Sequence, residues 1–198
     1  MIQLKIEELN QELERRMIES KYAHKRPVFG QGKLNATIAL VGEAPGGEEE
    51  REGRPFVGKA GKNLTEFLTS INLSRDEVYI TNAVKLRPSK PSPKTGRELN
   101  RTPSADEIKF FNQYLHLELE IIAPKYIVTL GNVPLRAVSG LDLKIGYCHG
   151  RLVSGNGYEN IFALYHPAAV IYNQALKDVY ADDLEKLREL IDNGTMEV

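Results

Sequence analysis

The segment from Ile38 to Gly61 constrains the fold more than any other part of the chain. It begins with a short apolar run, Ile38 to Val41, of the kind that forms a strand buried on both faces. At Gly42 the run passes into a loop rich in glycine, whose backbone can approach a ligand closely because there is no Cβ in the way. Ligands bind at the carboxyl ends of strands in open α/β sheets, so a binding site is expected here. An ordinary strand-to-helix connection is the alternative, because a glycine-rich loop alone is a weak signal.

Strands and helices alternate along the rest of the chain. Further strands are expected at 78–84, 126–130 and 161–165, and helices at 2–18, 63–71, 104–122, 132–138 and 179–191. The helix after residue 103 opens with a capping box, Ser104 to Glu107. This alternation predicts an α/β three-layer sandwich, with helices on both faces of a central, mainly parallel four-stranded sheet. With 198 residues, the chain is expected to form one domain, 1–198, around one hydrophobic core.

Composition excludes several classes of protein. No apolar run approaches the ~18 residues that a membrane span needs, and the amino terminus lacks a signal-peptide core. The single cysteine, Cys148, excludes an internal disulfide and fits a reducing compartment. We therefore expect a cytoplasmic monomer with no membrane partner. The net charge of −1 gives no overall basic signature, so any contact with nucleic acid must depend on local patches.

Three motifs resemble those of a known family. The first is Gly-Glu-Ala-Pro-Gly at 42–46, followed by Gly-Arg-Pro-Phe-Val-Gly-Lys-Ala-Gly at 53–61; the others are Thr-Asn-Ala-Val-Lys at 81–85 and Tyr-His-Pro-Ala-Ala at 165–169. Together they resemble the uracil-DNA glycosylase superfamily, and most closely its family 4, whose typical members carry an iron–sulfur cluster. The resemblance implies a monofunctional base-excision-repair enzyme, a hydrolase that cleaves the N-glycosidic bond of uracil in DNA and leaves an abasic site.

The resemblance also implies a pocket for a base flipped out of DNA. Phe56 matches the aromatic residue on which the base stacks, although core packing is the commoner use of a buried phenylalanine. Gly42 and Ala44 would contribute to the pocket wall at the end of the first strand. Asn82 could offer a donor and an acceptor to one base edge and so reject cytosine. The alternative for Asn82 is an amide that satisfies a turn.

The catalytic candidates come from two parts of the chain. His166 matches the family histidine that donates to a uracil carbonyl as negative charge develops there; most lone histidines are structural, but this one follows a buried strand and precedes Pro167. Glu43 and Glu49 match acidic residues of the first motif, while Ala44 stands where other branches carry a water-activating aspartate. A solvated loop is the alternative for the acidic run around Glu49. Asn100 matches a further polar residue of the family pocket.

Basic residues gather in a polar insert between 87 and 103 and just before it. We expect them to contact DNA phosphates, which supply affinity without reading sequence; they are Lys85, Arg87, Lys90, Lys94, Arg97 and Arg101. A solvated loop is the alternative. Residues 168–172 could insert an apolar wedge into the gap left by the flipped base, or could cap the sheet.

The chain departs from the family in its cysteines. Cluster-bearing members place two cysteines before the segment equivalent to 28–30, a third where this chain has Leu86 and a fourth near Phe111. Iron–sulfur clusters need thiolates, and Cys148 occupies none of these places. We therefore expect no cluster, no metal and no other cofactor, with Leu86 and Phe111 filling the space by packing.

Three alternatives to a uracil-specific enzyme are compatible with parts of the sequence. One is a glycosylase with a wider base range, including hypoxanthine. Another is a DNA-binding protein that has kept the fold but lost catalysis, since the aspartate and the cysteines are missing. The third is a nucleotide-phosphate-binding protein, suggested by the glycine and lysine spacing from Gly53 to Lys59. Ala60 stands where such a loop needs a hydroxyl for magnesium, so the third alternative is rejected.

Overall fold

The structure is a computed structural model that describes residues 1–195. Its main sheet has six strands in the order β1-β3-β2-β6-β8-β7. Four of them pair in parallel and correspond to the four predicted strands: β2 (Ile38–Gly42), β3 (Tyr79–Asn82), β6 (Tyr126–Leu130) and β8 (Tyr158–Leu164). The edge strands β1 (Gln31–Gly32) and β7 (Leu152–Gly155) pair antiparallel to them and were not predicted. The predicted α/β sandwich with its parallel centre is confirmed.

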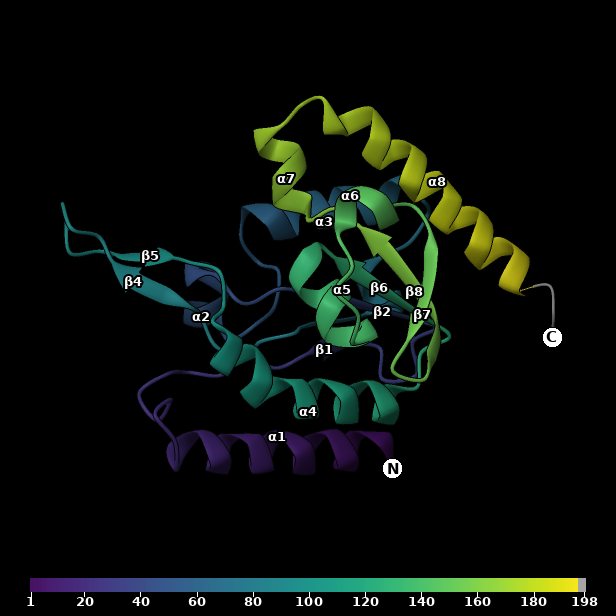
Figure 1. The fold of residues 1–198 in the computed structure, drawn as a ribbon. Helices are drawn as coiled ribbons and strands as arrows, with labels where there is room; N and C mark the ends of the chain where they lie inside the picture. The colour runs from purple at the N-terminus through teal and green to yellow at the C-terminus, as the bar shows by residue number, and fades with distance from the viewer. Residues whose placement is uncertain (196–198) are drawn as a thin grey trace.

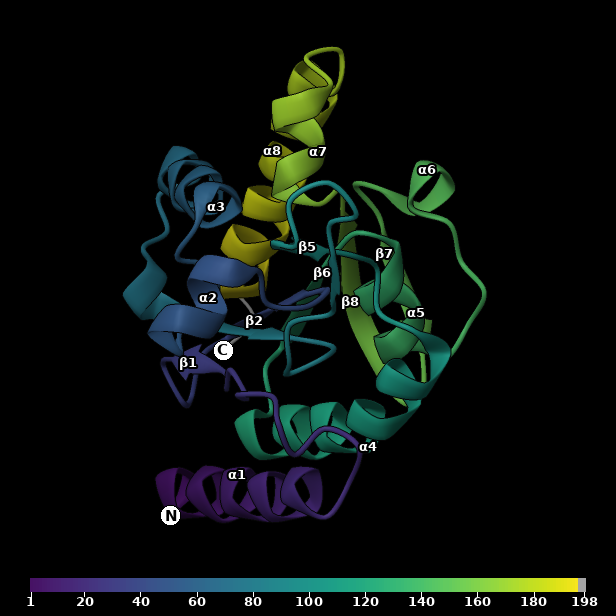
Figure 2. The ribbon, with the colours of Figure 1, turned by 90° about the vertical axis from the view of Figure 1, so that its left-hand side faces the viewer.

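Helices cover both faces of the sheet (Figures 1 and 2). One face carries α3 (Lys59–Ser70), α7 (Pro167–Tyr172) and α8 (Leu176–Thr195), and the other carries α4 (Ala105–Ile122) and α5 (Asn132–Ser139). Helix α1 (Ile2–Ile18) lies along α4 on the side away from the sheet. The short elements η1 (Arg75–Glu77) and α6 (Ile145–Cys148) lie in the connections. None of the helices within 1–195 is long and apolar enough to cross a bilayer.

The alternation of side chains along β2 explains the two cores. Ile38 and Leu40 pack with α3 and α8, while Ala39 and Val41 pack with α4 and α5. All five residues of this strand are buried. A strand in this position must be apolar on both faces, which is why its sequence shows a continuous apolar run rather than an alternating one.

Two polar segments have more structure than their sequences indicate. The acidic run, for which a solvated loop was the alternative, forms helix α2 (Gly47–Glu52). The polar insert forms a separate two-stranded hairpin, β4 (Ser89–Pro91) and β5 (Glu98–Asn100), with register Ser89 to Asn100. We refer to residues 89–100 as the hairpin. In Figure 1 it projects from the body of the molecule beside α2.

A third apolar cluster lies between α1, α4 and the segment that follows β3. It contains Leu13, Met17, Tyr22, Val84, Leu86, Phe111 and Tyr114. Leu86 and Phe111 are both fully buried in it. The expectation that these two residues are packed is therefore confirmed, and burying such side chains is worth ~1.5–3 kcal/mol each.

Candidate active site

A cavity of about 630 Å³ opens at the carboxyl ends of the parallel strands. Asn82 is the last residue of β3, and His166 lies two residues beyond β8. The cavity is lined by residues from the first motif, the start of α3, the hairpin and α7: Ala44, Gly46, Gly47, Glu48, Glu49, Phe56, Gly58, Lys59, Ala60, Lys62, Asn82, Asn100, His166, Ala168, Ile171 and Tyr172. The structure thus brings together candidate residues that are more than 120 positions apart in the sequence.

Phe56 is held in a strained backbone conformation on the cavity wall. Its φ is 53°, a region that costs a residue with a side chain on the order of 1–3 kcal/mol. The Arg75 guanidinium donates to the carbonyl oxygens of Pro55 and Phe56 at 3.0 and 2.9 Å. A Cβ at position 61 would lie 1.8 Å from the Phe56 oxygen, so Gly61 is required for this turn. The Phe56 ring stacks on the His166 ring at 6.0 Å between centroids.

Asn82 presents an unpaired acceptor to the cavity. Its side chain is buried, and Oδ1 has no hydrogen-bond partner among the described residues. A Cβ at position 42 would lie 2.3 Å from Asn82 Oδ1 and 2.5 Å from the Phe56 ring. Gly42 therefore allows the amide and the ring to converge. Since buried polar groups are almost always paired, this oxygen marks a place where a ligand donor fits.

His166 is a neutral hydrogen-bond donor in this site. Its Nδ1 accepts the backbone N–H of Ala168 at 3.1 Å and caps α7. A neutral imidazole with Nδ1 as acceptor carries its proton on Nε2. Burial lowers the pKa of His166 to about 4, and the nearby charge of Glu49 opposes this shift only in part. The imidazole is therefore uncharged at neutral pH.

Backbone amides hold the Glu49 carboxylate in place. Oε1 accepts the N–H groups of Val57 and Gly58 at 3.0 and 2.8 Å, and Oε2 accepts the N–H of Gly46 at 3.0 Å. Glu49 thus ties the two halves of the first motif together across α2. It faces the cavity as a fixed negative charge, with most of its acceptor capacity already used.

The other predicted carboxylate lies elsewhere. Glu43 is not among the described residues that line the cavity, and burial raises the pKa of its carboxyl group. Ala44 does line it, while Glu48, Lys59 and Lys62 line it without having been predicted. Lys59 belongs to the first motif, so its place in the cavity wall could have been predicted from the sequence. Nothing in the sequence near Arg75 indicates its contact with Phe56.

Asn100 reaches the cavity from the end of β5. Its Oδ1 accepts the Nε–H of Arg87 at 2.8 Å, so the amide NH₂ is the end left for the cavity. A Cβ on Gly46 would lie 3.3 Å from Asn100 Nδ2. This places the amide group beside the loop that Glu49 holds.

Three of the six predicted DNA contacts are engaged inside the protein. The prediction that Lys85 contacts DNA is wrong. Its side chain is 3% exposed and pairs with Glu118, which is 4% exposed, because a charge in the core must be paired. Arg87 pairs with Glu50 at 3.3 Å, and Arg101 pairs with Glu107 at 2.7 Å. The other three side chains are exposed and have no polar partner among residues 1–195; they are Lys90, Lys94 and Arg97 on the hairpin.

Comparison with known proteins identifies the family. The model of the Uracil DNA glycosylase superfamily matches residues 29–188. The type-4 uracil-DNA glycosylase of Archaeoglobus fulgidus is 41% identical over 172 residues, covering 82% of this chain and 81% of the relative. That of Sulfurisphaera tokodaii is 41% identical over 174 residues, covering 82% and 74%. The chain belongs to the uracil-DNA glycosylase superfamily.

A solved structure supports the fold. The crystal structure of wild-type SMUG2 from Pedobacter heparinus matches with a TM-score of 0.55 and 16% identity, covering 80% of this chain and 77% of that one. At this identity the likeness concerns the fold alone. It agrees with the parallel sheet and flanking helices described above.

The residues of this chain do not fit the iron–sulfur cluster of family 4. The places of the third and fourth cysteines hold Leu86 and Phe111, which are packed in the third apolar cluster. Cys148, the single cysteine, is on α6 and packs against the core between the sheet, α4 and α5. Within residues 1–195, no group of three or more histidine, cysteine or acidic side chains could hold a metal ion.

Chelation is expected to leave the protein unchanged. Packed apolar side chains, not thiolates, connect α4 to the segment after β3, so we expect no metal bond to contribute to folding. The purified protein should be colourless and keep its melting temperature in excess chelator. Elemental analysis for iron and zinc is the measurement, and stoichiometric metal together with a lower melting temperature in chelator would contradict the expectation.

Proposed function

We propose that this protein removes uracil from DNA by hydrolysing its N-glycosidic bond. The observation that carries the proposal is the buried, unpaired Oδ1 of Asn82, which converges with the Phe56 ring beside Gly42. Uracil presents an N–H next to a carbonyl, so one amide can accept from the first and donate to the second. Cytosine presents a bare nitrogen and an amino group there, and would leave polar groups unpaired in a dry pocket.

The Phe56 ring gives the flipped base a stacking surface, while Asn82 reads its edge. The C1′–N1 bond breaks, and its electron pair leaves with the uracil ring, where it is delocalised onto the carbonyl oxygen O2. His166 donates its Nε2 proton in a hydrogen bond to that oxygen. A neutral donor suits this role, because it stabilises the developing charge and needs no change in its own protonation.

Hydrolysis is completed by water. Water forms a bond to C1′ of the cationic sugar and releases a proton to solvent, and the uracil anion takes up one proton, which leaves neutral free uracil and an abasic site. The fixed charge of Glu49 faces the cavity and offsets the positive charge of the sugar, as carboxylates do in glycoside hydrolysis. The NH₂ group of Asn100 and the last acceptor site of Glu49 are the groups that we assign to this water. Glu43 has no role in this proposal.

The DNA surface is assigned to the hairpin and the end of α7. The exposed basic side chains of Lys90, Lys94 and Arg97 belong to the same hairpin as Asn100, which lines the cavity. Tyr172, at the end of α7, is 87% exposed at the cavity and is our candidate for the wedge, together with Ile171. We further propose that the protein acts as a cytoplasmic monomer, a state that gel filtration tests.

Neutralising Lys90, Lys94 and Arg97 together is expected to weaken DNA binding for all sequences alike. Each lost phosphate contact lowers the slope of log affinity against log salt by about 0.9. The measurement is a salt titration of binding to duplexes with and without uracil. A matched control neutralises Lys5, Lys33 and Arg151, three exposed basic residues far from the hairpin in sequence. A slope that changes in the control but not in the hairpin variant would move the phosphate contacts elsewhere.

A panel of oligonucleotides tests the base range. Matched strands carry uracil, cytosine, thymine or hypoxanthine at one position, and alkali cleaves wherever a base has been removed. We expect cleavage of the uracil strand and none of the cytosine strand. Removal of hypoxanthine at a comparable rate would favour the enzyme with a wider base range. Tight DNA binding without removal of any base would favour the inactive binding protein.

A further inference from the structure

Arg101 lies at the junction between the hairpin and the body of the protein. The two ends of the hairpin meet where Arg101 donates its backbone N–H to the Pro88 carbonyl at 3.1 Å. Beyond this point the chain enters helix α4 through its capping box. Outside the two short strands, most of the hairpin is exposed to solvent. Whatever fixes this junction therefore fixes the direction in which the hairpin leaves the protein.

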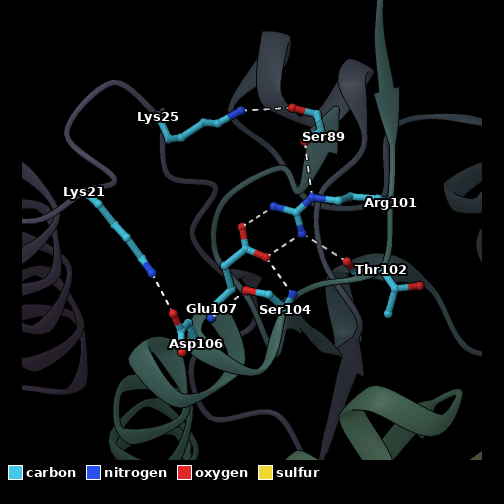
Figure 3. A network of polar contacts seen from close by, with 8 residues as sticks. All are labelled: Lys21, Lys25, Ser89, Arg101, Thr102, Ser104, Asp106 and Glu107. Atoms are coloured by element: carbon cyan, nitrogen blue, oxygen red, sulfur yellow. Dashed lines mark hydrogen bonds and ion pairs between the residues drawn. The ribbon is translucent and has the colours of Figure 1, made fainter. Parts of the chain in front are cut away.

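Arg101 contacts both sides of the junction (Figure 3). Its Nη1 and Nη2 donate to the two carboxylate oxygens of Glu107 at 2.7 and 2.8 Å, which is a bidentate pair. Its Nε donates to the Ser89 carbonyl at 3.2 Å, and Nη1 also donates to the Thr102 carbonyl at 3.1 Å. The guanidinium thus links the first residue of β4 to the first turn of α4.

The capping box of α4 orients the Glu107 side chain independently of Arg101. Glu107 accepts the backbone N–H of Ser104 at 2.7 Å, and its own N–H donates to Ser104 Oγ at 3.2 Å. Its side chain is 6% exposed, and the Arg101 guanidinium lowers the pKa of its carboxyl group. A bidentate partner that is already oriented by a helix cap loses little freedom when the pair forms.

The pair lies among the segments in which the resemblance to family 4 would place the cluster cysteines. A cavity of about 410 Å³ is lined by residues of the segment 21–25, by Leu86, and by both members of the pair. Lys25 Nζ donates to Ser89 Oγ at 3.0 Å across it. The segment before residue 28, the segment after β3 and the start of α4 therefore meet here through polar contacts.

Asn100 lies between two such arginine contacts. Arg101, the next residue, holds the junction to α4, while Arg87 holds the Asn100 amide and pairs with Glu50 of α2. Arg87 also donates to the Glu98 carbonyl at 3.0 Å. Asn100, which reaches the candidate active-site cavity, is thus held both by its backbone pairing with Ser89 and by its side-chain hydrogen bond with Arg87.

We propose that the Arg101–Glu107 pair is a positioning device for Asn100, and that it holds the hairpin in the place of the missing cluster. Arg101 does not line the candidate active-site cavity; it acts through Asn100. The role in catalysis rests on the proposed function, whereas the order of the hairpin does not. Displacing a positioned group by about 1 Å can cost on the order of 10²-fold in rate.

A double-mutant cycle separates this role from the alternatives. Arg101→Ala should slow single-turnover uracil excision roughly ten- to hundred-fold. In an Asn100→Ala background the same change should have little further effect, because both changes remove one function. Arg101→Lys should restore little, since an ammonium does not form the bidentate pair. Equal rate losses in the two backgrounds would overturn the proposal and make Arg101 a direct DNA contact or a general stabiliser.

Hydrogen exchange tests the hairpin independently of activity. Backbone amides of residues 89–100 should exchange faster in Arg101→Ala and in Glu107→Gln, with unchanged exchange in β2 and β6. Lys21→Ala is the matched control, because its ion pair with Asp106 contacts the same first turn of α4 but is 64% and 73% exposed. Unchanged exchange in the hairpin of Arg101→Ala would overturn the proposal, even in a protein that excises no uracil. If the wild-type protein excises no uracil but the hairpin still exchanges faster in Arg101→Ala, the proposed function would be wrong and the positioning of the hairpin by this pair would stand.

Discussion

Replacing His166 by alanine is expected to slow uracil excision by ~10²–10³, because it removes one preorganised donor to the oxygen on which charge develops. The fold should be retained, since the ring contributes one cap hydrogen bond and one ring contact. Single-turnover excision and thermal unfolding are measured together. His24→Ala is the control, because His24 is exposed and distant from the cavity residues in sequence. A near-normal rate in His166→Ala would remove this residue from the mechanism.

The acid dependence follows from the low pKa of His166. Because its folded pKa is about 4, below the ordinary 6.5, the unfolded chain binds more protons between these values. This group's contribution to stability is therefore complete above pH 6.5 and is lost as pH falls toward 4. Its neutral donor form persists through the same range. Titration of the His166 ring by NMR should show an ordinary neutral imidazole at pH 6, and a protonated ring at that pH would contradict the account.

Replacing Lys85 by methionine is expected to destabilise the fold by ~3–5 kcal/mol, because it leaves a charged partner buried without compensation. The Lys85 ammonium donates to Glu118, to Thr81 Oγ1 at 2.6 Å and to the Asn82 carbonyl at 2.8 Å. Glu118 also accepts from Tyr79 at 2.8 Å. Because Lys85 contacts the Asn82 backbone, the variant should also lose discrimination between uracil and cytosine. Chemical unfolding and the base panel are the measurements.

Two variants show whether charge burial is the cause. Lys90→Met removes a lysine of the exposed hairpin and should change stability by less than about 0.5 kcal/mol. Lys85→Met combined with Glu118→Leu removes both buried charges and should recover a large part of the loss, because a buried pair can be replaced by apolar groups. A Lys85→Met protein as stable as the parent would mean that this lysine does not complete the network.

Much of the architecture could be predicted from local signals. The capping box at Ser104 places the start of α4 at Ala105, and the apolar runs place the four parallel strands within a few residues. The edge strands could not be predicted. Strand β1 has two exposed residues, and β7 alternates without a strong apolar side. Helix α2 was missed because a run of glutamates repels itself, whereas in the structure the Glu49 carboxylate accepts the backbone N–H of Gly46 at the start of the helix.

For the candidate site, the sequence predicted the motif residues of the cavity but not the positions of the basic residues. Motif residues Phe56, Asn82 and His166 do line one cavity, because each follows a buried strand or its loop. The basic residues could not be sorted by sequence, since a lysine shows no sign of a partner 33 positions away. Lys85 is therefore in the core, while Lys90 in the same basic segment is on the surface. Arg75 donates to the Phe56 carbonyl from the short helix η1, which lies outside the three family motifs.

Release of free uracil tests the central claim most directly. Purified protein in excess over a duplex with one uracil is followed by mass spectrometry for the free base and by alkali cleavage for the abasic site. The account predicts that the two products appear together and in equal amounts, that the DNA backbone stays intact without alkali, and that Asn82→Ala loses most of the release. Absence of free uracil from the wild-type reaction, or its undiminished release by Asn82→Ala, would contradict the account.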